Sequence, residues 1–175
     1  DERAAALGQE RAVSLDCDTA ELTTEAEREN TNMQTGKGIA VPAILKVGEG
    51  TLKKIGTYLK AEQIEQVVIF FGNGLIDLFG MDVMNSLKEE GITVLEYNEL
   101  DTVDIDDIIT LAFAMPNRTQ AVISIGGGKV MDLAKAVAVQ SGCGVFTVPT
   151  SAATCACYAP LSVIYDEQGT QAGIR

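Results

Sequence analysis

The chain alternates short apolar runs with helical patterns, and this alternation constrains its fold more than any other feature. Apolar, largely β-branched runs predict strands over residues 43–47, 67–71, 92–97, 121–125 and 145–148. Between them, apolar residues recur at helical spacing over 52–59, 75–87, 104–116 and 130–139. The run Val67–Phe71 is apolar at every position, which is typical of a strand buried on both faces. The sequence therefore predicts an α/β fold, an open parallel sheet with helices on both faces.

The two ends of the chain depart from this pattern. Residues 1–35 hold nine acidic and three basic residues and so carry half of the net charge of −12. We expect this acidic segment to be poorly packed or foreign to the α/β domain predicted over 36–175. At the other end, Leu161–Gly169 predicts a strand and a turn, and Thr170–Arg175 the first residues of a returning strand. The chain is therefore expected to end within a hairpin and to be part of a longer protein.

Charge and composition exclude several classes of function. The chain has no histidine, which excludes a Ser-His-Asp triad and a histidine-ligated metal within it, and no metal site is predicted in this chain. Its negative charge argues against nucleic acid or an anionic membrane as a partner. No apolar run approaches the roughly 20 residues of a membrane span, and no signal pattern opens the sequence. We therefore expect a soluble, cytoplasmic protein with reduced thiols.

Three strand ends carry candidate binding segments: Gly72–Gly74, Gly126–Lys129 and Pro149–Thr154. In open parallel sheets, ligands bind beyond the carboxyl ends of the strands. The triple glycine is the strongest signal, because glycines let a backbone approach a ligand and the following helix offers unpaired N–H groups. The sequence thus predicts a phosphate or pyrophosphate site at Gly126, Gly127 and Gly128, with Lys129 as an added cation. The alternative is a tight turn without a ligand, for which one glycine would suffice.

Two named motifs compete with this interpretation. A Walker A loop is excluded because Ile123 and Val130 stand where it needs glycine and a hydroxyl residue. Gly72–Gly74, with Glu96 predicted at the end of the next strand, has the layout of a classical Rossmann unit. Its third glycine is replaced by Asp77, so this unit remains the weaker competitor.

The segment Thr150–Ala159 is small and rich in hydroxyl groups. Its hydroxyls either bind a cofactor or substrate or satisfy their own backbone; the residues concerned are Thr147, Thr150, Ser151 and Thr154. Cys155 and Cys157 are predicted to be buried, inert thiols, because the chain offers no histidine base. The alternative to a functional role is that Lys129 and Lys135 are ordinary solvated helix residues, and that Asp132 is a first-turn residue favoured by the helix dipole.

Two segments together resemble one known family. Gly126–Ala138 resembles the cofactor motif of the iron-containing alcohol dehydrogenase superfamily, in its glycerol dehydrogenase branch. Pro149–Thr154 followed by Leu161–Tyr165 resembles the second motif of that branch at matching separation. The resemblance covers roughly residues 42–175 and not 1–35. It implies the NAD(P)-binding N-terminal domain of a dehydroquinate-synthase-like enzyme, whose zinc or iron ligands would lie in a helical domain outside this chain.

The resemblance also implies roles for individual residues. Gly128, Lys129 and Asp132 would lie along the pyrophosphate and ribose, and Thr150, Leu161 and Tyr165 would line the nicotinamide side. The complete set of candidate cofactor residues is Gly72, Gly126, Gly127, Gly128, Lys129, Asp132, Thr147, Thr150, Leu161 and Tyr165. Many NAD-preferring relatives carry an aspartate where this chain has Gly72, so its absence should admit NADP as well as NAD. Cys155 stands where glycerol dehydrogenases carry an aspartate that touches the polyol, which makes it the candidate substrate residue.

The predicted function is an NAD(P)-dependent oxidoreductase acting on a small hydroxy or oxo compound. The segment Ala152–Ala156 around Cys155 resembles the hydroxycarboxylate dehydrogenases. This resemblance, together with a thiol in place of the carboxylate, favours a 2-oxo acid as substrate. The alternatives are a glycerol or glycerol-1-phosphate dehydrogenase, a lyase that uses NAD transiently, and a non-catalytic nucleotide-binding fragment. The expected partners are a small-molecule substrate and a second copy of the chain, and no catalytic residue is assigned.

Overall fold

The computed structural model describes residues 42–100, 105–165 and 171–174. The predictions for residues 1–35, and for the turn at 166–169, lie outside these residues. No helix within the described ranges has both the length and the apolarity to cross a membrane.

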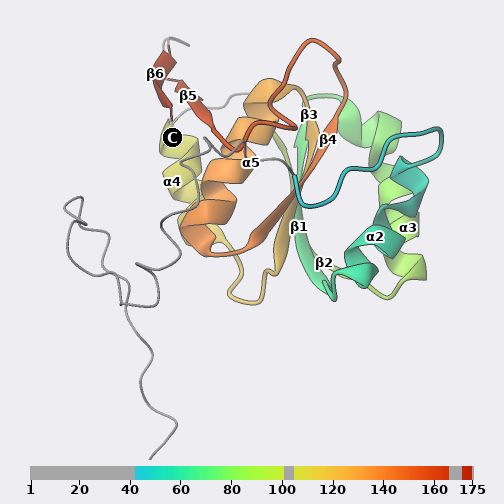
Figure 1. The fold of residues 1–175 in the computed structure, drawn as a ribbon. Helices are drawn as coiled ribbons and strands as arrows, with labels where there is room; N and C mark the ends of the chain where they lie inside the picture. Colours follow the sequence, from blue (N-terminus) through green and yellow to red (C-terminus); the bar gives the residue numbers. More distant parts are fainter. Residues whose placement is uncertain (1–41, 101–104, 166–170, 175) are drawn as a thin grey trace, which may run out of the picture. The chain divides into compact units, whose positions relative to one another are not determined.

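A sheet of four parallel strands forms the centre of the domain (Figure 1). The strands are β1 (Gln66–Gly72), β2 (Thr93–Leu100), β3 (Ala121–Gly126) and β4 (Gly144–Pro149). Their order in the sheet is β2-β1-β3-β4, with every neighbouring pair parallel. The five residues Val67–Phe71 are at most 1% exposed, which confirms the prediction of a strand covered on both faces.

Helices cover both faces of this sheet (Figure 1). One face packs against α2 (Ile55–Ala61) and α3 (Met81–Glu89), and the other against α4 (Ile105–Ala114) and α5 (Gly128–Ser141). Each face of the sheet has its own hydrophobic core. Alternate residues of β1 belong to the two cores, because successive side chains of a strand point to opposite faces. Val67, Ile69 and Phe71 pack with Leu59 and Leu87, whereas Val68 and Phe70 pack with Leu133 and Val137. The predicted α/β fold is confirmed.

Two short helical turns refine the predicted helices. The 3₁₀ turn η1 (Leu52–Lys54) precedes α2, and the π-helical turn η2 (Ile76–Gly80) precedes α3. Gly91 follows α3 with φ +73°, the left-handed conformation that glycine adopts readily at helix ends. The helix predicted over 75–87 with Gly91 as its terminator is therefore confirmed.

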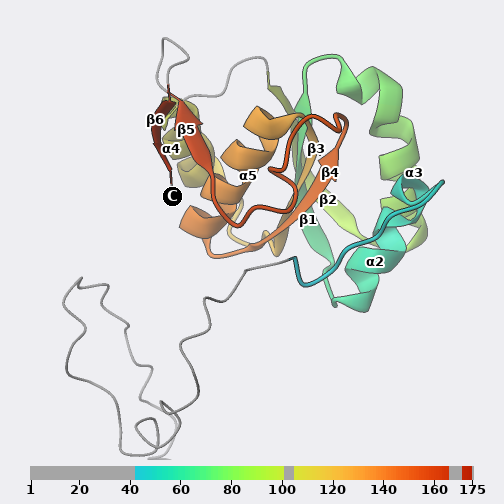
Figure 2. The ribbon, with the colours of Figure 1, turned by 45° about the horizontal axis from the view of Figure 1, so that its top comes forward.

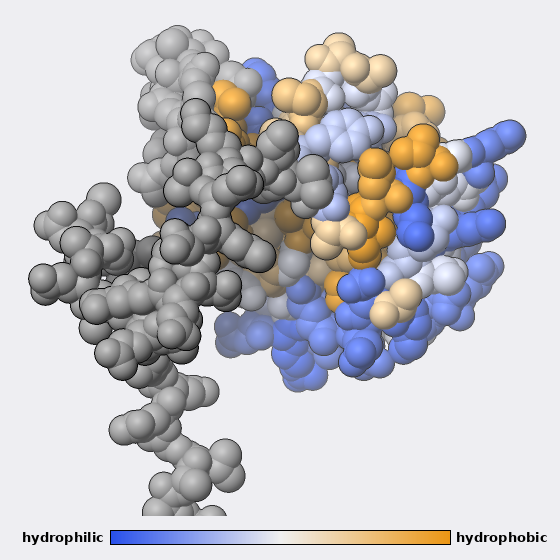
Figure 3. All heavy atoms as spheres, in the orientation of Figure 1, coloured by the Kyte–Doolittle hydropathy of each residue, from blue (hydrophilic) through white to orange (hydrophobic). Residues whose placement is uncertain are grey.

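The strand predicted over 43–47 is wrong. This segment belongs to no ladder, and Leu45 and Val47 are 59% and 82% exposed. A groove of about 870 Å³ is lined by residues 42–48 on one side and by β4 on the other. Hydrophobic surface lies on this face of the molecule (Figure 3). An apolar run becomes a strand only where another main chain comes within hydrogen-bonding distance, and here the groove intervenes.

The last described residues form a hairpin, as predicted. β5 (Val163–Tyr165) and β6 (Gln171–Ile174) pair in antiparallel fashion. The β4–β5 loop, residues 150–162, has no regular secondary structure and lies over α5 (Figure 2).

Candidate functional site

The order of the strands places a crevice between β1 and β3. The chain leaves β1 through α3 to reach β2 on one side, and leaves β3 through α5 to reach β4 on the other. Open α/β sheets bind ligands at such a point of reversal, beyond the carboxyl ends of the two central strands. Gly72 and Gly126 are the last residues of these strands. A Cβ atom on Gly126 would lie 3.5 Å from the Gly72 nitrogen, so the two main chains meet closely at the crevice.

Helix α5 begins at this crevice, directly after the glycine bend Gly126–Gly128. Gly127 precedes the helix in an extended conformation (φ −84°, ψ −177°), and no side chain caps the helix N-terminus. The N–H groups of a first helical turn have no carbonyl four residues back, and the turn carries a partial positive charge. The 14-residue helix therefore offers an anion the kind of site that the sequence predicts.

The three glycines of the bend meet different surroundings. A Cβ on Gly126 would lie 3.1 Å from Cβ of Val130, and one on Gly128 would lie 2.8 Å from Oγ1 of Thr154. A Cβ on Gly127 would meet nothing within 4 Å, and the φ of this residue suits any amino acid. Packing within the chain therefore accounts for two of the glycines and leaves the third, on the open side, unexplained by the fold.

Asp132 and Lys135 are buried on α5, with 6% and 8% exposure. Lys135 Nζ lies 2.7 Å from Asp132 Oδ1, an ion pair one helical turn apart. The alternative of a solvated Lys135 is wrong, because the β4–β5 loop covers this part of α5. Asp132 is not a first-turn residue either, since the helix begins at Gly128. The role of Asp132 toward a cofactor stays a prediction.

Most hydroxyls near the bend hold the loop itself. The bonds are Thr147 Oγ1 to Cys157 O at 3.3 Å, Ala153 N to Ser151 Oγ at 3.2 Å, and Ala156 N to Thr154 Oγ1 at 3.1 Å. These three side chains make the bonds that a self-satisfied loop requires, and their role toward a cofactor or substrate stays a prediction. Thr150 donates its backbone N–H to Gly126 O at 3.0 Å, which ties the start of the loop to the bend.

The remaining candidates are distributed around the same edge. Lys129 is exposed in the first turn of α5, and Thr150 and Leu161 are exposed on the loop. Tyr165 lies in β5, with its side chain outside the described part. Cys155 is exposed, so its prediction as a buried thiol is wrong, whereas Cys157 is partly buried. The turns of this small-residue loop leave the Cys155 side chain outside the packed layer.

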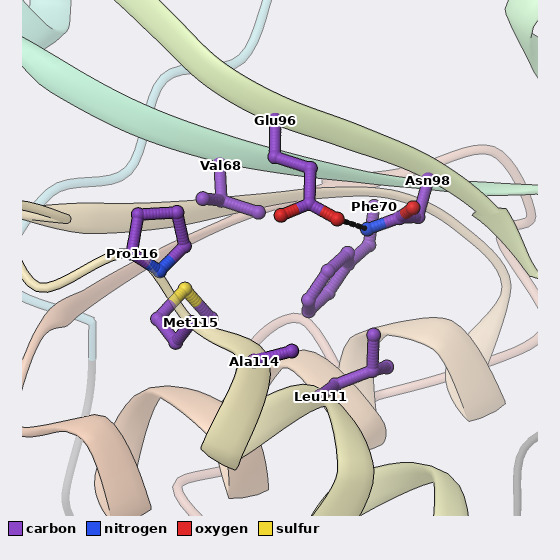
Figure 4. A pocket seen from close by; sticks show the side chains of 8 residues that line it. All are labelled: Val68, Phe70, Glu96, Asn98, Leu111, Ala114, Met115 and Pro116. Carbon is purple, nitrogen blue, oxygen red and sulfur yellow. Dashed lines mark hydrogen bonds between the residues drawn. The ribbon is translucent and has the colours of Figure 1, made fainter.

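The competing interpretation of Gly72–Gly74 and Glu96 as a classical Rossmann unit does not fit the observed strands. Glu96 lies in the middle of β2, opposite Val68, and the strand continues to Leu100. Its carboxylate accepts a hydrogen bond of 3.0 Å from Asn98 and lines a small cavity above Phe70 (Figure 4). The acid is therefore well short of the strand end where a ribose would lie, because β2 is longer than its apolar core suggested.

The groove of about 870 Å³ runs along β4. Its lining includes Lys135, Thr147 and residues 157–160 of the β4–β5 loop, but not the glycine bend. Within the part of the chain that the structure describes, no group of three or more histidine, cysteine or acidic residues is arranged to hold a metal ion. No step through a metal is therefore derived from these residues.

Sequence reasoning missed the structural role of Lys135. The signal was present, because Lys135 stands within a helical stretch, Val130–Val139, that is apolar on most sides. A charged residue in such a helix has no solvent-exposed face available and must find buried partners.

Residues 42–175 match the model of the iron-containing alcohol dehydrogenase family, so this chain belongs to that family. It is similar to glycerol dehydrogenase 1 of Schizosaccharomyces pombe, with 30% identity over 115 residues, which cover 64% of this chain and 25% of that protein. It is also similar to hydroxycarboxylate dehydrogenase A of Escherichia coli, with 44% identity over 63 residues, covering 36% and 17% of the two chains. The crystal structure of the S. pombe glycerol dehydrogenase superposes with a TM-score of 0.65 at 26% identity, covering 71% of this chain and 32% of that one. The chain therefore spans about a third or less of these relatives.

Proposed function

We propose that residues 42–175 form the cofactor-binding part of an NAD(P)-dependent oxidoreductase acting on a small alcohol or carbonyl compound. One observation carries the proposal: Gly127 has open space around its missing side chain at an uncapped helix N-terminus. A ligand that approaches the backbone closely explains a glycine that the fold does not need. The family supplies the kind of ligand, a dinucleotide whose nicotinamide accepts or donates the hydride.

In this proposal the chain binds and orients the cofactor. The N–H groups around Gly127 and Gly128 bind the diphosphate, and the exposed Lys129 adds positive charge. Gly72 brings no carboxylate to the adenosine end, so a 2′-phosphate is not repelled and NADP is accepted. Thr150 and Leu161, both exposed, flank the nicotinamide end.

We propose a small polyol such as glycerol as the substrate class. The similarity to glycerol dehydrogenase 1 of S. pombe extends over 64% of the chain, against 36% for the hydroxycarboxylate dehydrogenase. A 2-hydroxy acid is the second candidate, because the exposed Cys155 thiol would not repel an anionic substrate. Turnover of glycerol, dihydroxyacetone, glycerol 1-phosphate and a 2-oxo acid by the complete natural protein distinguishes them. Faster turnover of the 2-oxo acid would exclude the polyol proposal.

Cofactor binding is tested on the 175-residue chain itself. Binding is followed by the change in nicotinamide fluorescence in titrations with NADPH and NADH. We expect saturable binding that ADP displaces, with NADPH bound at least as tightly as NADH. Absence of binding for both dinucleotides, with the chain folded, would contradict the proposal.

A further inference from the structure

Lys135 is surrounded by acceptors from a loop far from it in sequence. Its Nζ donates hydrogen bonds of 3.1 Å to the carbonyl oxygens of both Ala156 and Ala159. It also donates to the carbonyl of Leu161 and forms the ion pair with Asp132. An ammonium group has three N–H donors, and three loop carbonyls take them.

Such an arrangement is costly, and stability alone does not explain it. Removing a charge from water carries a penalty that a buried ion pair often only balances. Apolar residues of similar volume would fill the same space at equal or lower cost. What the ammonium provides, and an apolar side chain cannot, is a fixed position for each of three carbonyl groups.

The loop needs this fixing because it has no ladder or helix of its own. Apart from the bond of 3.3 Å that the Thr147 hydroxyl of β4 donates to Cys157 O, the other bonds described across residues 154–159 are local, including those from the Tyr158 and Ala159 N–H groups to Cys155 O. Its start lies directly on the glycine bend, where the space next to Gly128 is closed by the Thr154 hydroxyl. Movement of the loop would therefore change the wall of the proposed cofactor site.

We propose that Lys135 is a positioning residue that holds the β4–β5 loop on α5 and so shapes the nicotinamide end of the cofactor site. The claim that Lys135 holds the loop on α5 is independent of any cofactor. The claim that the held loop shapes the nicotinamide end rests on the proposed function. The two claims are tested separately.

The first test measures amide hydrogen exchange in Lys135→Met. We expect exchange at Tyr158 and Ala159 to accelerate by about tenfold or more, because their loop loses its three bonds to the helix. Exchange in the core strand β3 should stay as in the parent chain. The matched control is Lys88→Met, which removes an exposed lysine of α3. Unchanged exchange at Tyr158 and Ala159 in Lys135→Met would overturn the proposal.

The second test compares whole and truncated cofactors. ADP supplies only the adenosine and diphosphate parts of the cofactor, whereas NADPH also reaches the nicotinamide end. We expect Lys135→Met to weaken NADPH binding by about tenfold while ADP binding stays within about twofold. Equal affinities of parent and variant for NADPH would overturn the positioning role. Failure of the parent chain to bind either ligand would instead contradict the proposed function and leave the exchange result standing.

Fast amide exchange in β3 would show that Lys135→Met does not fold. In that case a second variant, Lys135→Arg, tests the proposal. Lys135→Arg keeps the positive charge beside Asp132, but its planar fork does not direct donors at three carbonyls that converge on one atom. We expect the arginine variant to fold, to exchange faster at Tyr158 and Ala159, and to bind NADPH more weakly than the parent. Parent-like exchange and affinity in Lys135→Arg would overturn the geometric argument.

Discussion

Replacement of Gly127 by alanine separates ligand binding from folding. The added methyl group would meet nothing within 4 Å, and φ −84° with ψ −177° is open to alanine. The folded chain is therefore not strained, while the unfolded chain loses conformational freedom. We expect the free energy of unfolding to stay the same or to rise by about 0.4–1 kcal/mol.

The same methyl group would stand in the space through which a diphosphate approaches the bend. A hydrogen bond to a charged group contributes about 1.5–3 kcal/mol. Loss of one such bond weakens binding by about 10- to 100-fold, at 1.4 kcal/mol for each factor of ten. Gly127→Ala should therefore bind NADPH more weakly by that factor while unfolding no more easily than the parent chain.

The assay pairs a fluorescence titration with NADPH and a urea denaturation curve. The matched control is Gly144→Ala at the opposite edge of the sheet, where the methyl group would lie an ordinary 3.5 Å from the Gln120 carbonyl. This control should bind NADPH like the parent. Undiminished affinity in Gly127→Ala, or a loss of affinity that merely follows a loss of stability, would refute the reasoning.

Three further predictions concern other positions. Gly72→Asp should bind NADPH about tenfold more weakly than Gly72→Ala, because both add a Cβ about 3.2 Å from Leu75 Cδ1 but only aspartate repels a 2′-phosphate; equal NADPH affinities would contradict this. Gly56→Ala should lower the free energy of unfolding by about 2 kcal/mol or more in urea, because its Cβ would lie 2.1 Å from the Ser86 carbonyl; a parent-like denaturation curve would oppose it. Burial raises the pKa of the Cys143 thiol, so peptide mapping should find iodoacetamide on the exposed Cys155 first, with Cys143 gaining as pH rises; the reverse order would be inconsistent with the structure.

The sequence predicts the layered core well, because the relevant signals are local. The uninterrupted apolar run Val67–Phe71 and the glycines that follow β1 and β3 define strands and their ends without reference to distant residues. The strand predicted over 43–47 is wrong because strand formation there depends on contacts with distant residues. Those residues have the composition of a strand, but pairing depends on whether another edge comes close enough, which no local pattern contains.

The candidate site is predictable in its outline and not in its internal bonding. The bend at Gly126–Gly128 is visible as a pattern, and the structure adds that Gly127 alone has open space. The hydroxyl of Thr147 and the ammonium of Lys135 find partners ten or more residues away in a loop without regular structure. Spacing along the chain does not encode such contacts, so the sequence could not tell a ligand-binding hydroxyl from one that holds the loop.

The backbone amides of the bend give the most direct test of the account. In a nitrogen-15 spectrum of the 175-residue chain, titration with ADP and then NADPH should shift the Gly127, Gly128 and Lys129 amide signals saturably. The amide signal of Val145, near the start of β4 and so far from the carboxyl ends of the strands, should stay in place. Bound NADPH that leaves the three bend amides unshifted would contradict the claim that this bend holds the cofactor.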